Sequence, residues 1–93
     1  MCTYRTEVVD LEGSGKGPAG WFRFTRASVY VDHPYHAPAV HTLNIDLADP
    51  AQGPSARIAL ELSEDAARML VAAIETALAA APAGLAASPV RDR

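Results

Sequence analysis

The sequence predicts an α+β domain in which a four-stranded antiparallel sheet (ββββ) carries one C-terminal helix packed across one face. Apolar and polar residues alternate in residues 40–47 and 57–62, the period of a half-buried strand. Residues 64–80 then repeat apolar side chains at the spacing of one helix face. With 93 residues the chain has length for one core. We assign residues 1–82 to a single domain and residues 83–93 to a weakly ordered tail.

The first half of the chain predicts two strands and a turn. Residues 2–11 are rich in Thr, Tyr and Val and predict the first strand. Residues 12–20 contain four glycines and a proline, so we expect a mobile connection there. Aromatic and β-branched residues predict a second strand at 21–31. Pro34 and Pro38 each lack a backbone donor, which places a turn before the third strand.

The second half of the chain predicts two strands and the helix. Odd-numbered residues from His41 to Leu47 share one face of the third strand. After a loop rich in proline and glycine, residues 57–62 repeat the alternation. Ser63 is a favourable helix N-cap, and the two acidic residues after it suit the positive end of the helix dipole. We expect the helix to end near Ala80, because Pro82 disfavours helical backbone before it.

Charge and composition exclude several classes of partner. Eight Lys and Arg against eleven Asp and Glu give a formal net charge of −3, and no basic stripe is present to bind nucleic acid. No segment approaches the roughly 18 apolar residues of a membrane span, and the N-terminus lacks the features of a signal peptide. One cysteine cannot form an internal disulfide, which fits a reducing compartment. We therefore expect a cytoplasmic protein that binds neither nucleic acid nor membrane.

The most concentrated chemistry is the segment DHPYHAPAVH at 32–41, which contains all three histidines. The register that matches the apolar faces of the two flanking strands places His33 opposite His41, with Cβ atoms about 4.5–5.5 Å apart. His36, in the turn, adds a third imidazole. Three His ligands leave an open coordination position, as in catalytic zinc sites, and Cys2 or water would complete the sphere.

The metal site has one functional interpretation and two alternatives. With the metal, the protein would be an enzyme that holds zinc or copper and acts as a hydrolase or lyase on a small molecule. Alternatively, the histidines are ordinary polar residues near a sheet edge. The protein is then a non-catalytic homo-oligomeric module, most simply a dimer, that binds a small molecule without metal, and its uncovered sheet face forms the interface. The third interpretation is a metal-free enzyme with His33 or His41 as a general base.

Three more residues are candidates for substrate binding. Lys16 lies in the glycine-rich segment, which would act as a flexible flap that brings a cation over a pocket. Trp21 is a stacking platform for an aromatic ligand, unless it covers a sheet edge. Tyr35 lies beside the histidines in the proline-bounded turn. If Met1 is removed, Cys2 becomes an amino-terminal nucleophile and chelating group.

Four segments of the chain are distinctive: MCTY at 1–4, GSGKGPAGWF at 13–22, DHPYHAPAVHTLNID at 32–46 and GPSAR at 53–57. Together with the alanine-rich helix they resemble a family of small actinobacterial proteins of unknown function. The resemblance covers nearly the whole chain and implies a cytoplasmic actinobacterial protein, in keeping with seven arginines to one lysine. It implies no activity, so no site residue follows from it.

Overall fold

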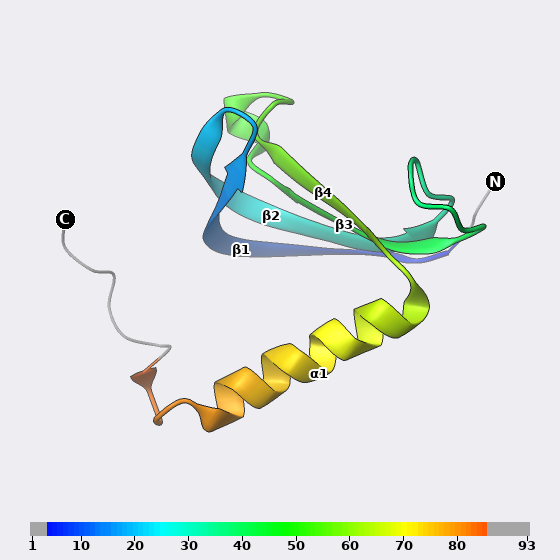
Figure 1. The fold of residues 1–93 in the computed structure, drawn as a ribbon. Coiled ribbons are helices and arrows are strands. Elements are labelled where there is room, and N and C mark those ends of the chain that lie inside the picture. Colours follow the sequence, from blue (N-terminus) through cyan, green and yellow to red (C-terminus); the bar gives the residue numbers. More distant parts are fainter. Residues whose placement is uncertain (1–3, 86–93) are drawn as a thin grey trace.

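The computed structural model describes residues 4–85 and contains one antiparallel sheet in the order β1-β2-β3-β4, followed by a helix (Figure 1). The elements are β1 (Thr6–Gly17), β2 (Gly20–Asp32), β3 (Thr42–Ala48), the 3-10 helix η1 (Pro50–Gln52), β4 (Arg57–Leu62) and α1 (Glu64–Ala80). The predicted α+β class, strand number and C-terminal helix are confirmed.

The register between β2 and β3 is the one that matching of apolar faces predicts. Val29 pairs with Ile45 and Val31 pairs with Leu43. On the other side of β3, Leu62 of β4 pairs with Leu43. Paired residues point to the same side of a sheet, so these five side chains define one face, the helix-side face. The opposite face is called the polar face.

The helix α1 begins and ends where the sequence predicts. The Ser63 hydroxyl accepts a hydrogen bond from the backbone N–H of Ala66 at 3.1 Å, which caps the first turn. The N–H of Ala81 closes the last turn on the carbonyl of Ala77, and Pro82 follows. Within residues 4–85, no helix has both the length and the apolar character needed to cross a membrane.

The glycine-rich segment is not the mobile connection that its composition predicts. Residues 13–17 form the second half of β1 and pair with β2, so the connection shrinks to residues 18–19. A Cβ atom at Gly13 would overlap the ring of Phe24. Glycine here permits a close approach of side chain to backbone in an edge strand, rather than flexibility. In the described part of the chain the first strand is therefore Thr6–Gly17, which extends past the predicted end at residue 11; residues 2 and 3 of the predicted strand lie outside the described residues.

Burial in this chain is shallow. Among the described residues, Ala27 and Ala56 are the buried apolar side chains, and no large side chain is fully enclosed. Thr42 and Asn44 are buried on the polar face, where the Thr42 hydroxyl donates to Asn44 Oδ1 at 2.6 Å. The shallow burial follows from the placement of α1, which starts at one end of the sheet and runs back along one face with a widening separation (Figure 1). The helix therefore flanks the sheet without closing a core against it.

Candidate functional site

His33 and His41 lie together, as the predicted register requires. They directly follow and precede the last residue pair of the β2–β3 ladder. Their imidazole rings are stacked, with centroids 4.6 Å apart and planes 28° apart. His33 Nδ1 lies 3.0 Å from the Val40 carbonyl oxygen, and the Tyr4 ring meets the His41 ring edge-on at 5.9 Å. The two histidines thus belong to a small aromatic cluster at the end of the sheet.

His36 is held elsewhere, through its backbone. The Glu61 carboxylate on β4 accepts hydrogen bonds from three consecutive backbone N–H groups, those of Tyr35, His36 (3.0 Å) and Ala37 (2.8 Å). These bonds, with that of Ala37 the strongest influence, hold the pKa of the Glu61 carboxyl below its ordinary value. Within residues 4–85, no three His, Cys, Asp or Glu side chains converge in a way that could hold a metal ion.

The alternation of residues 57–62 identifies Glu61 only as a strand residue and does not reveal its contact with the loop. The signal is in the turn itself. Pro34 and Pro38 have no N–H to donate, and they bracket three consecutive residues that do. Glu61 pairs with Asn44 on the neighbouring strand, which places its side chain on the polar face. One carboxylate there satisfies all three donors and fixes the loop at 33–41 against the sheet.

The remaining predicted site residues do not join the histidine pair. Cys2 lies outside the described residues. Lys16 pairs with Trp21 near the tip of the β1–β2 hairpin, and both side chains are exposed. In Figure 1 this tip and the loop at 33–41 lie at opposite ends of the sheet. Tyr35 is close to the histidines in sequence, but its side chain is fully exposed.

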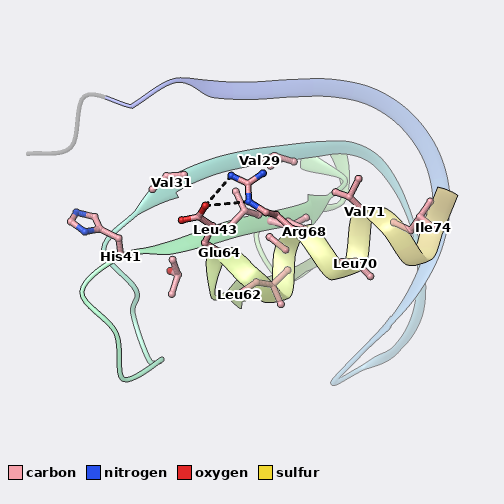
Figure 2. Close-up of a pocket in the computed structure, with 13 residues that line it drawn as sticks. Val29, Val31, His41, Leu43, Leu62, Glu64, Arg68, Leu70, Val71 and Ile74 are labelled. Carbon is pink, nitrogen blue, oxygen red and sulfur yellow. Dashed lines mark hydrogen bonds and ion pairs between the residues drawn. The ribbon is translucent and has the colours of Figure 1, made fainter. Parts of the chain in front are cut away.

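A groove of about 700 Å³ lies between the helix-side face of the sheet and α1 (Figure 2). Aliphatic side chains of β2 and β3 form one wall, and α1 forms the other. The lining residues are Val29, Val31, His41, Thr42, Leu43, Ile45, Leu62, Glu64, Ala67, Arg68, Leu70, Val71 and Ile74. The volume lies within the range of about 300–1,000 Å³ that is usual for small-molecule sites.

The polar groups of the groove gather at one end. His41 directly precedes β3, and Glu64 and Arg68 lie in the first turns of α1. Thr42 borders the groove at the same end, although its hydroxyl bonds to Asn44 on the polar face. Glu64 Oε2 accepts from Arg68 Nε at 3.1 Å and from Nη2 at 2.9 Å, as Figure 2 shows. Because α1 starts directly after β4, the sheet and the helix are closest at this end. The two diverge along α1 (Figure 1), and the lining residues from its later turns, Leu70, Val71 and Ile74, are aliphatic.

The polar face carries a separate hydrogen-bond network. The Tyr30 hydroxyl donates to Asp46 Oδ2 at 2.9 Å, and Arg57 Nη2 donates to Asp46 Oδ1 at 2.7 Å. Burial, with the Asp46 carboxylate as the next cause, raises the pKa of Tyr30 above its ordinary value. The network pairs these groups with each other, so it serves to hold the strands in register.

A family model described as a family of unknown function (DUF6295) matches residues 1–87. The chain belongs to this family. The DUF6295 match spans every strand and α1, so the groove and the histidine pair both lie inside the family region. No curated protein and no solved structure matches the chain. The DUF6295 description states no activity.

Proposed function

We propose that the protein is a non-catalytic binding module that takes a small amphipathic molecule in the groove between the sheet and α1. One observation carries the proposal: the groove has aliphatic walls, and its polar lining residues gather at one end. Binding sites for small molecules combine a mostly apolar surface with a few polar groups that orient the ligand. A ligand with an apolar body and one polar end fits this distribution.

The apolar walls supply the affinity. Val29, Ile45 and Leu43 face the groove from the sheet, and Val71 and Ile74 face it from α1. A linear acyl chain between them would remove apolar surface from water on both sides. Each buried methylene contributes about 0.8 kcal/mol, before the cost of fixing the ligand is subtracted.

The polar end sets the orientation of the ligand. The Arg68 guanidinium has five N–H donors, of which one on Nε and one on Nη2 bond to Glu64. The His41 imidazole, which is exposed at the same end, offers a further ring nitrogen. The Arg68 donors that Glu64 leaves free are matched by an acceptor head group such as a carboxylate.

Calorimetric titration with dodecanoate and with dodecyltrimethylammonium, each below its micelle-forming concentration, tests the proposal. The two probes share an alkyl chain and differ in head-group charge. We expect dodecanoate to bind with one molecule per chain, more tightly than the cation. Arg68→Gln should weaken dodecanoate binding about tenfold, because a charge-assisted hydrogen bond contributes about 1.5 kcal/mol or more.

The matched control is Arg57→Gln, which changes the same residue type on the polar face. It should leave dodecanoate affinity unchanged, since Arg57 bonds to Asp46 away from the groove. Absence of binding by both probes would refute the module. An equal loss of affinity in Arg68→Gln and Arg57→Gln would show that Arg68 does not contact the ligand.

A divalent metal is the second candidate, favoured by the 4.6 Å separation of the His33 and His41 rings. Imidazole suits zinc or copper, and His36 or Cys2 would have to supply the further ligands. A metal there would acidify a bound water for hydrolase or lyase chemistry on a small molecule. Elemental analysis of untagged protein decides this: stoichiometric metal that a His33→Ala/His41→Ala variant loses establishes the site, and metal-free wild-type protein after supplementation refutes it.

A further inference from the structure

We infer that a second copy of this chain covers the open side of the groove, so that the functional unit is a homodimer. The surface involved, the dimer surface, consists of Val9 and Leu60 on the sheet and Ile74 and Leu78 on α1. This inference goes beyond the proposed ligand site, because it rests on exposed apolar area and needs no ligand.

The chain exposes more surface than a compact monomer of its mass. Its accessible surface is 7501 Å², whereas a compact monomer of 9.8 kDa exposes about 5,200 Å². Even if the eleven residues outside 4–85 are given the full area of an extended chain, about 1,700 Å², the rest exceeds the value for its size by about 1,000 Å². A standard interface buries about 800 Å² on each partner. The excess is therefore sufficient for a stable dimer.

Apolar side chains are exposed on both sides of the groove. On α1, Val71, Ile74 and Leu78 share one stripe, yet they are 57%, 51% and 58% exposed. On the sheet, Val9 is 47% exposed and Leu60 is 38% exposed. Their ladder partners place both side chains on the helix-side face. Val9, Leu60 and Leu78 do not line the groove, so a ligand inside it would leave them exposed.

The occupant is a second copy because the two open surfaces complement each other. An aliphatic helix stripe and an aliphatic sheet face are the two layers that an α+β fold packs together. Within one chain they diverge, as Figure 1 shows. In a two-fold symmetric dimer, α1 of each copy lies against the sheet of the other, and one symmetry operation covers both surfaces. The dimer also supplies the enclosed core that a single chain lacks.

Sedimentation equilibrium of the ligand-free full chain tests the inference. We expect wild-type protein to sediment at twice the chain mass of 9.8 kDa. Leu78→Glu, which puts a charge in the dimer surface, should sediment as a monomer. Met69→Glu is the matched control: Met69 is also exposed on α1, but nine residues from Leu78 it points to the opposite side of the helix. This variant should remain a dimer.

A milder variant separates loss of the dimer from loss of the fold. Leu78→Ala keeps a strong helix former at an exposed helix position, so it should fold and weaken the dimer about 10- to 100-fold. A wild-type chain that sediments as a monomer up to about 100 μM overturns the inference. An unchanged dimer dissociation constant in Leu78→Ala would show that the interface lies elsewhere. Equal dimer dissociation constants in Leu78→Glu and Met69→Glu would show the same. Dodecanoate plays no part in these measurements, so a dimer that fails to bind dodecanoate refutes only the ligand proposal.

Discussion

The two faces of the sheet differ in how their side chains are stabilised. On the polar face, Asp46 accepts hydrogen bonds from Tyr30 at 2.9 Å and Arg57 at 2.7 Å, and Glu61 binds three backbone N–H groups of the loop at 33–41. On the helix-side face, aliphatic side chains border an open groove. Within residues 4–85, every buried polar side-chain atom has a hydrogen-bond partner in the same chain. The helix-side face needs a ligand, a second copy, or both.

This difference follows from the nature of the two interactions. A hydrogen bond is short and directional, so one well-placed partner on a neighbouring strand completes it. Hydrophobic burial is proportional to area, and an aliphatic face remains costly until enough surface covers it. A small chain with a single helix can complete its hydrogen bonds locally before it can bury all of its apolar surface.

The largest expected effect comes from placing the same charge on each face. Ile45→Lys puts an ammonium group in the helix-side face, where Ile45 lines the groove. Ala59→Lys puts it on the exposed polar side, where Ala59 pairs with Asp46. If the helix-side face is covered in the functional state, Ile45→Lys should lower the free energy of unfolding by about 3–5 kcal/mol. Ala59→Lys should change it by less than about 0.5 kcal/mol.

Urea denaturation of the two lysine variants measures the difference. Their unfolding midpoints should be well separated at one fixed protein concentration, because dimer stability depends on concentration. Equal midpoints would mean that the helix-side face is as tolerant of charge as the polar face, and the contrast between the faces would be lost.

A smaller effect is expected inside the polar face. Asn44→Ala removes the acceptor of the Thr42 hydroxyl, which is buried and bonded to Asn44 Oδ1 at 2.6 Å. An unsatisfied buried hydroxyl costs about 1–3 kcal/mol. The free energy of unfolding should fall by that amount, and Thr42→Val in the same background should recover part of it. Two single variants and the double variant, measured by urea denaturation, give the coupling between the two side chains. Strictly additive losses would show that the hydrogen bond contributes nothing.

The strand register and the helix bounds were predictable because local signals determine them. Matching the apolar faces of two strands excludes a one-residue slip in their alignment, and this placed His33 beside His41. The Ser63 cap and Pro82 delimit α1 by backbone chemistry that does not depend on the rest of the fold. Such signals act over a few residues, so one sequence is enough to interpret them.

The glycine-rich strand and the open groove were not predictable. The composition of residues 13–17 is the same whether glycine serves a flexible loop or a close approach to Phe24, and the difference lies in a tertiary contact. Likewise, the alternating pattern identifies Ile45 as a residue that prefers burial, but it does not identify the surface that covers this residue. The hydrogen bonds between the turn and Glu61 were not predictable either, because Glu61 lies 24 to 26 residues from their donors in the sequence.

The smallest expected effect is the pH dependence that Glu61 confers on the polar face. The loop N–H groups hold its pKa below the ordinary value of 4.5 in the folded chain. The stability it contributes is therefore fully present above about pH 4.5 and is lost as pH falls through the lowered folded pKa. Glu61→Gln should lower the urea midpoint at pH 7, and its difference from wild type should shrink steadily toward pH 3. Glu75→Gln, an exposed glutamate on α1, should reproduce neither effect, and a Glu61→Gln difference that stays constant with pH would mean that the carboxylate charge does not hold the loop.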